Sequence, residues 1–386
     1  MSDHTIAANL LRLRKNKNLT QEQLADAAGL SRAAYRNLEK GRAMPRTDTL
    51  KGLSRALDVP LKELLSPVEL LSNVRFRSLK RLKSRDQVLA DVSRWLRDFT
   101  ELEALTGERH EHSLQPLCRE IARQRRKHTP EIAALAREHF GLGAREPVHD
   151  ICGLLESRGI KVYSIQVAND AFMGLSVAED NGGPAIIVNT WERLPVETWI
   201  FSAAHELAHL LLHLSAYDVT EEQEDEAQEK EADQFASHFL MPEEAFRREW
   251  DDAAGLPLVD RVLKVKRVFR ASWRTVLYRV AEGLPEDRRY VVWKLFNQAY
   301  REHKGRSLLK HDEPQGITEE VYKDTHGARP VGIEPAGMES HDFREDRLSL
   351  LVRRAVERDI ISLSRGAEIL RLPLEQMRAL AATWVA

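Results

Sequence analysis

Cysteine is nearly absent from this sequence, which has only Cys118 and Cys152 among its 386 residues. The two lie far apart and form no CxxC pair, which excludes a disulfide framework and a cysteine-based zinc knuckle. Long hydrophobic runs are also absent, because no apolar stretch approaches the ~18 residues of a transmembrane helix. The first residues lack the pattern of a signal peptide. We therefore expect a cytoplasmic protein with no membrane partner.

An excess of charge of one sign is missing as well. The formal net charge is -2, so any contact with a nucleic acid must come from a local basic patch and not from a global field. A hydrophobic content of 42% and a charged content of 31% are typical of a chain that buries ordinary cores. The length allows two or three domains.

The first part of the chain, residues 5–67, has the periodicity of five short helices joined by tight turns. Thr20 is placed to cap the helix that begins with Gln21-Glu22-Gln23, and Gly29 supplies a tight turn after it. Ser31 is placed to cap the next helix, which runs to Gly41. This order of two capped helices separated by a glycine turn predicts a helix-turn-helix whose second helix reads the major groove.

The segment resembles the Cro/repressor-type domain of the xenobiotic-response-element regulators, in the pattern TQEQLA, G, S, LEKG, P. Its side chains expected to contact DNA lie at the front of one helix and along the next: Gln21, Ser31, Arg32, Ala33, Tyr35, Arg36 and Lys40. The predicted core consists of Leu24, Ala25, Leu30, Leu38, Leu50, Leu53 and Leu57. The alternative is a helical bundle without affinity for DNA.

Residues 69–144 are helix-like and basic, with clusters at Arg75–Arg85 and Arg123–Lys127. These clusters would form either a phosphate-contacting surface or the solvated face of connecting helices, and we favour the second. Beyond them, residues 160–167 alternate apolar and polar side chains and residues 185–188 are apolar, so both predict strands.

The segment His205-Glu206-Leu207-Ala208-His209 carries the chemistry of the chain. On a helix, histidines four residues apart share one face, which suits two ligands of a tetrahedral zinc ion. Glu206 follows the first ligand directly, so its carboxylate is placed to act as general base on a metal-bound water. The flanking alanines and leucines predict a buried helix, in which such a polar trio would be costly without a metal.

A third ligand must come from elsewhere. His213 follows His205 by two residues fewer than the third histidine does in the HExxHxxGxxH pattern. It therefore fits a packing role better than a ligand role. In the helix that follows, Glu231 stands four residues before the inward-facing Phe235, whereas Glu229 is expected to point elsewhere. We therefore predict Glu231 as the third ligand. Tyr217 and His238 are candidate donors to the transition state, although a core or surface role fits each of them better.

Three segments in order, residues 185–189, 201–213 and 231–242, resemble the ImmA/IrrE metallopeptidases. That resemblance implies a zinc protease that cleaves repressor proteins, with His205, His209 and Glu231 as ligands and Glu206 as base. It also implies that Met241-Pro242 ends the helix that supports the ligand. Activity held low until a signal arrives, with single-stranded DNA as a candidate activator, follows from the same resemblance.

The expected architecture is multi-domain: an all-α helix-turn-helix domain plus an α+β zincin-like metallopeptidase domain, mostly helical overall. The expected limits are 1–68 for the DNA-binding domain, 69–144 for a basic connector, 145–303 for the peptidase, and 304–386 for a linker and C-terminal helices. The role of the last segment is open.

Two functions are consistent with these patterns. The first is a regulator that binds double-stranded operator DNA, possesses a zinc endopeptidase and cleaves a repressor, another regulatory protein or itself in a stress, mobile-element or phage response. The second is a DNA-binding repressor or antitoxin-type regulator whose zinc is structural or sensory. An open fourth zinc position would favour the first function, and four protein ligands the second. A homodimer is compatible with both.

Overall fold

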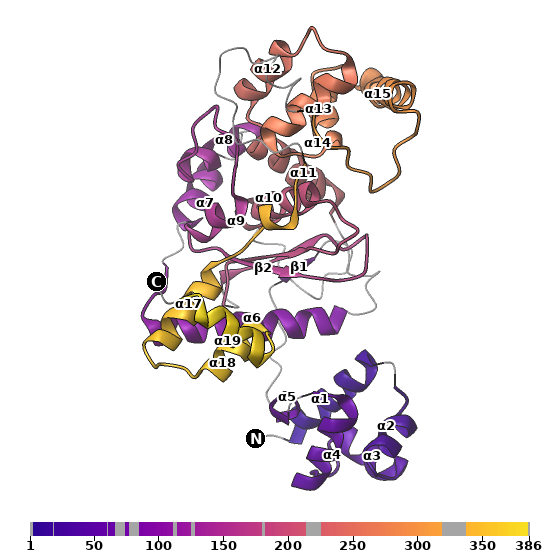
Figure 1. Ribbon diagram of the computed structural model, residues 1–386, viewed down its shortest axis with the longest axis vertical. Coiled ribbons are helices and arrows are strands. Elements are labelled where there is room, and N and C mark those ends of the chain that lie inside the picture. Colours follow the sequence, from indigo (N-terminus) through magenta and orange to yellow (C-terminus); the bar gives the residue numbers. More distant parts are fainter. Residues whose placement is uncertain are drawn as a thin grey trace. The chain divides into compact units, whose positions relative to one another are not determined.

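The computed structural model describes residues 3–17, 19–59, 61–65, 74–76, 85–110, 114–124, 128–179, 182–213, 225–318 and 337–384. The chain forms two compact units (Figure 1). The N-terminal unit comprises Met1–Leu71 and Leu82–Phe99, and the C-terminal unit comprises Ser72–Arg81 and Thr100–Ala386. Helix α6, Arg85–Thr106, therefore begins in the first unit and ends in the second.

The N-terminal unit confirms the predicted helix-turn-helix architecture. Its first five described helices are α1 (Asp3–Asn16), α2 (Gln21–Ala27), α3 (Arg32–Glu39), α4 (Thr47–Leu57) and α5 (Leu61–Leu65). The Thr20 side chain accepts a hydrogen bond from the Gln23 amide, and the Gln23 side chain accepts one from the Thr20 amide, so a complete capping box starts α2. Ser31 caps α3 through the Ala34 amide. Gly29 between them has a φ of +69°, a conformation that favours glycine.

The core of this unit lies where α1 to α5 meet. Five of the predicted core residues are buried, and Leu30 and Leu50 pack against them partly buried. The end of α3 is tied to α1, because the Arg14 guanidinium donates two hydrogen bonds to the Glu39 carboxylate at 2.9 and 2.8 Å. A charge-assisted pair of this kind fixes the direction of α3, the helix expected to enter the groove.

The C-terminal unit contains a four-stranded sheet in the order β1-β3-β4-β2. The strands are β1 (Val74–Phe76), β2 (Lys161–Ile165), β3 (Gly174–Val177) and β4 (Ala185–Asn189). β2 and β4 are parallel, whereas β3 runs antiparallel to both β4 and β1. The predicted strands correspond to β2 and β4. The sequence pattern did not reveal β1 and β3, which are shorter.

The main core forms between this sheet and a layer of helices. The helices that contribute are α7 (Leu114–Arg123), α8 (Thr129–His139), α9 (Ile151–Glu156), α10 (Val196–Leu212) and α11 (Glu226–Leu240). α10 contacts β3 and β4 and also packs against α11, and α11 in turn packs against α8. Most residues of α10 are therefore buried, including the polar residues Glu197, Ser202, His205, Glu206 and His209.

Four further helices enclose a second core beside the first one: α12 (Glu243–Asp252), α13 (Leu258–Phe269), α14 (Trp273–Glu282) and α15 (Arg289–Lys304). Figure 1 shows these helices gathered at one end of the unit. Ile317, within the segment predicted to be a linker, is buried in this core. The last helices, α17 (Arg347–Glu357), α18 (Leu363–Leu370) and α19 (Leu374–Ala382), pack in series.

The predicted limits of the connector differ from the structure. α7 and α8 belong to the main core of the C-terminal unit, because their apolar faces cover α10 and α11. Arg347 at the start of α17 pairs with Glu103 near the end of α6, and Lys161 of β2 pairs with the same carboxylate at 3.0 Å. Most residues of the basic clusters lie outside the described part of the chain. No helix in the described ranges has the length and apolar character needed to span a bilayer.

Candidate functional site

Helix α10 carries two histidines whose rings face each other. Nε2 of His205 lies 3.0 Å from Nε2 of His209, and the two residues are only 2% and 1% exposed. The four-residue spacing places both rings on one face of α10, as the sequence predicted. Because α10 is covered by the sheet and by α11, these nitrogens converge where the side chains are shielded from solvent.

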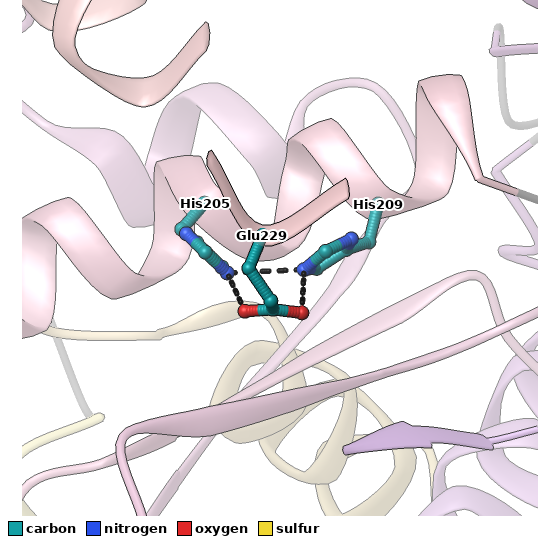
Figure 2. Close-up of side chains that lie close together, drawn as sticks. All are labelled: His205, His209 and Glu229. Atoms are coloured by element: carbon teal, nitrogen blue, oxygen red, sulfur yellow. Dashed lines mark hydrogen bonds and ion pairs between the residues drawn. The ribbon is translucent and has the colours of Figure 1, made fainter. Parts of the chain in front are cut away.

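A carboxylate from α11 completes the cluster. Glu229 places Oε2 at 3.3 Å from Nε2 of His205, and Oε1 at 3.4 Å from Nε2 of His209. Figure 2 shows the carboxylate spanning both imidazoles. In the described part of the chain, these three residues form the group whose donor atoms lie close enough together to share a metal ion. Two imidazole nitrogens and one carboxylate are a donor set typical of catalytic zinc sites.

The prediction of Glu231 as third ligand is corrected by this geometry, and the expectation that Glu229 points elsewhere is wrong. The Glu231 carboxylate instead contacts Nε2 of His213 at 3.0 Å. The reason is that α11 is buried on two sides. Its Phe235 and Phe239 rings stack, and Phe239 meets Phe140 at the end of α8, so sharing a face with Phe235 does not direct a side chain to the histidines.

The face of α11 that does meet α10 is marked by Glu229 and by Asp233, one helical turn later. Oδ1 of Asp233 lies 2.8 Å from Nδ1 of His205. A carboxylate that accepts the Nδ1 proton fixes the tautomer of a histidine and leaves its Nε2 lone pair available to a metal.

The second histidine is held by a different partner. Nδ1 of His209 lies 2.9 Å from Nδ1 of His213, and Nε2 of His213 reaches Glu231. His213 therefore contacts the outer nitrogen of a candidate ligand, as a packing residue would, and not the metal position. Each candidate histidine ligand is thus linked to a carboxylate on α11: His205 directly to Asp233, and His209 through His213 to Glu231.

In the absence of a metal, the carboxylates of this cluster favour the protonated form of His205. Burial by itself would lower the pKa of His205, but the Asp233 and Glu229 carboxylates outweigh it and raise that pKa to about 9. Burial would raise the pKa of Glu229, yet the hydrogen bonds from His205 and His209 hold it well below its usual range. A negative carboxylate, partly buried against two imidazoles, fits a divalent cation, which would take the place of the proton.

Glu206, next to the first histidine, lies against the backbone of β3. A Cβ atom on Gly174 would stand 3.4 Å from Cγ and Oε1 of Glu206 and only 2.8 Å from the carbonyl oxygen of Ile187. The position therefore excludes any side chain. Sequence reasoning did not single out Gly174, because nothing local to it signals the approach of a helix from residue 206.

Neither candidate transition-state donor gains support from the structure. Nε2 of His238 lies 3.0 Å from Oε2 of Glu282 and also contacts the Arg279 guanidinium, so it faces α14. Tyr217 lies outside the described residues.

In the N-terminal unit, α3 presents a polar stripe. Six of the seven residues predicted to contact DNA are exposed or partly exposed: Gln21, Ser31, Arg32, Ala33, Arg36 and Lys40. Asn37, one helical turn beyond Ala33, is exposed on the same stripe and was missed, although helical spacing from Ala33 indicates it. Arginine and asparagine are side chains that read base edges in the major groove.

The prediction of Tyr35 as a DNA contact is wrong. The ring is fully buried among the core residues of α1, α2 and α4, and its hydroxyl donates to the carbonyl of Leu10 at 3.4 Å. Tyr35 lies one helical turn before Glu39 and next to the face of Leu38, which are both buried. It therefore belongs to the inward face of α3, opposite Arg36 and Lys40.

Comparison with known families agrees with these two sites. Residues 10–64 match the helix-turn-helix family model, and residues 155–281 match the model of the IrrE N-terminal-like domain, a peptidase family. The second match spans β2 to α14 and includes all of α10 and α11.

Curated relatives match over shorter segments. The HTH-type transcriptional activator BcrR of Enterococcus faecalis is 40% identical over 74 residues, which are 19% of this chain and 36% of that protein. The HTH-type transcriptional regulator y4dJ of Sinorhizobium fredii is 39% identical over 64 residues, 17% of this chain and 83% of its own. The cryptic phage CTXphi transcriptional repressor RstR of Vibrio cholerae is 30% identical over 76 residues, 19% of this chain and 68% of its own. This chain thus spans about a third of the length of BcrR.

Proposed function

Since the chain belongs to the helix-turn-helix transcription regulators and joins their DNA-binding domain to a metallopeptidase-type, IrrE N-terminal-like domain, we propose that it is a regulator with zinc-dependent endopeptidase activity. Its substrate is a repressor or another regulatory protein, and the response is one to stress, a mobile element or a phage. The observation that carries this proposal is the convergence of His205, His209 and Glu229, with Glu206 directly beside them.

His205, His209 and Glu229 would hold the zinc ion, which supplies polarisation of the scissile carbonyl and a water of lowered pKa. Glu206 would take a proton from the attacking water and deliver it to the nitrogen of the leaving amine, so that one peptide bond breaks as one water is consumed. Asp233 and His213 would keep the two imidazoles in the orientation that presents Nε2.

Three donors, and not four, favour catalysis over a structural or sensory zinc. Among the described residues the cluster contains two histidines and one glutamate, which leaves one tetrahedral position for water or substrate. A non-proteolytic regulator would be better served by a closed site with four protein ligands.

The test is to incubate the zinc-loaded protein with candidate repressors from the same cell and to identify fragments by mass spectrometry. Glu206→Gln should reduce cleavage by about 10²–10⁴-fold, the usual contribution of a general base, while operator binding stays unchanged. Glu244→Gln, an exposed carboxylate on α12, is the matched control and should cleave normally. Equal product from wild type and Glu206→Gln would contradict the proposal.

The DNA-binding domain is expected to act on double-stranded operator DNA as a homodimer, with half-sites related by two-fold symmetry. Single-stranded DNA remains a candidate activator of the peptidase. If a single-stranded oligonucleotide leaves the rate of repressor cleavage unchanged, that part of the proposal fails.

A further inference from the structure

A short strand of the chain's own backbone lies along the outer edge of β3. β1, Val74–Phe76, pairs antiparallel with β3 in the register Val74 with Val177, Arg75 with Ser176, and Phe76 with Leu175. In sequence, β1 lies after α5 of the DNA-binding helices and before α6. It therefore belongs to the connection between α5 and α6, and by compactness it is part of the C-terminal unit.

The strand that β1 covers borders the catalytic carboxylate. Going forward along β1, each residue pairs with an earlier residue of β3, so Phe76 lies opposite Leu175 and the next position of β3 is Gly174. Gly174 is the residue whose backbone lies against the Glu206 side chain. β1 thus runs along β3 in the direction that leads towards Glu206.

An added antiparallel strand is a common way in which an extended peptide binds to a sheet edge, since main-chain hydrogen bonds supply affinity for any sequence. β3 has a partner on its other side, β4, and it contacts α10, which carries Glu206 and both histidines. The edge that β1 takes is therefore the edge at which an extended substrate would reach the metal cluster.

We propose that β1 is a substrate strand supplied by the chain itself, and that the peptidase cuts its own chain next to β1. This inference rests on the proposed endopeptidase function and names one of its substrates. One water would add across one peptide bond to give a new carboxylate and a new amine, with Glu206 carrying the proton. The DNA-binding helices α1–α5 would then be held to the rest of the chain only by their packing against the first part of α6, where Arg94 pairs with Glu63 at 2.9 Å.

The intramolecular supply of β1 has a kinetic consequence. A tethered segment is present at a high effective concentration, so the reaction should be first order and independent of protein concentration.

The experiment uses the purified full-length protein, freed of metal and then loaded with zinc, and follows its intact mass with time. Two fragments are expected whose masses sum to the chain plus one water, with new ends next to residues 74–76. A synthetic peptide with the sequence of residues 70–84 is added to the same reaction as a substrate in trans.

Two variants at one position separate backbone pairing from side-chain effects. Arg75→Pro fixes the backbone φ angle at the middle of β1, so it should disturb the pairing of β1 with β3 and slow self-cleavage by roughly tenfold. Arg75→Ala keeps the backbone and should cleave at close to the wild-type rate. Normal cleavage of the added peptide by Arg75→Pro would show that the peptidase of this variant is folded.

The other outcomes overturn the inference in distinguishable ways. If the peptide is cut and the chain stays intact, β1 is a permanent edge strand and the endopeptidase function stands. If neither is cut, the inference fails, and the repressor assay with Glu206→Gln decides separately whether the endopeptidase function stands. Faster cleavage of the peptide by Arg75→Pro, with no self-cleavage, would mean that β1 blocks the edge. A rate that rises with protein concentration would mean that one copy cuts another.

Discussion

The candidate DNA-binding face and the candidate metal site are built in opposite ways. The exposed stripe of α3 comes from one stretch of the chain, within residues 32–40, and one helix positions all of it. The candidate metal cluster combines His205 and His209 of α10 with Glu229 of α11, and the carboxylate of Glu206, the proposed base, lies against Gly174 of β3. A local site follows from helix periodicity, whereas a distributed site depends on how separate elements pack. Variants in each region can test this difference.

The largest effect is expected for the inward face of α3. Tyr35→Ala should destabilise the N-terminal unit by about 3–5 kcal/mol, as the loss of a fully buried aromatic ring does, and should abolish operator binding by unfolding. Hydrogen exchange of the α2–α4 amides measures this. Tyr35→Phe is the control: it keeps the buried ring and removes only the hydroxyl, which contacts Leu10 and Glu39, so it should cost about 1 kcal/mol. Normal exchange with lost DNA affinity in Tyr35→Ala would restore Tyr35 as a DNA contact.

The next effect compares the two glutamates of α11. Removing an outer partner of a metal-bound histidine costs about 10–100-fold in metal affinity. Glu231→Gln, which alters such an outer partner, should therefore weaken zinc binding by about tenfold. Glu229→Gln, which alters a proposed ligand, should weaken zinc binding by more than about 100-fold. Competition with a chromophoric chelator measures both. A larger loss in Glu231→Gln than in Glu229→Gln would return the ligand role to Glu231.

A smaller effect is expected on the exposed stripe. Arg36→Ala should weaken operator binding by about 1–3 kcal/mol without changing the unfolding of the N-terminal unit, because its side chain is exposed. Fluorescence anisotropy with labelled operator DNA measures the affinity. Arg55→Ala, an exposed arginine at the end of α4, is the matched control. If the two variants lose affinity equally, binding depends on overall charge and not on the face of α3.

The smallest effect tests how local the first region is. Thr20→Ala removes the capping box of α2 and should lower the free energy of unfolding of the N-terminal unit by about 1 kcal/mol. The C-terminal unit should be unaffected, and its α10 begins after Pro195 without a side-chain cap. Chemical denaturation followed by hydrogen exchange resolves the two units. Destabilisation of both would mean that they unfold together.

Much of the fold was predictable because its signals are local. The caps at Thr20 and Ser31 and the turn at Gly29 fix the helices of the N-terminal unit. The strands β2 and β4 were visible in their apolar patterns. β1 and β3 span only 3 and 4 residues, too few for periodicity to be read, and their pairing partners define them.

The candidate site was only partly predictable, for the same reason. His205 and His209 share a face of one helix at any packing, so their spacing is sufficient. The choice between Glu229 and Glu231 depends on which face of α11 meets α10 and which meets α8, and both faces are buried. Tyr35 was wrongly predicted to contact DNA. It stands between the exposed residues Ala34 and Arg36, and only the packing of α1 against α3 shows that its ring points inward.

The sequence by itself determined the helices of the N-terminal unit, the shared face of His205 and His209 on α10, and the exposed arginines of α3. Backbone capping and side-chain periodicity act within a few residues, so they can be read along one dimension. Only the tertiary structure decided which carboxylate faces the histidines, why position 174 must be glycine, and which strand covers the edge of β3. Those facts arise from contacts between residues far apart in the chain, and close packing of α10, α11 and the sheet fixes them together.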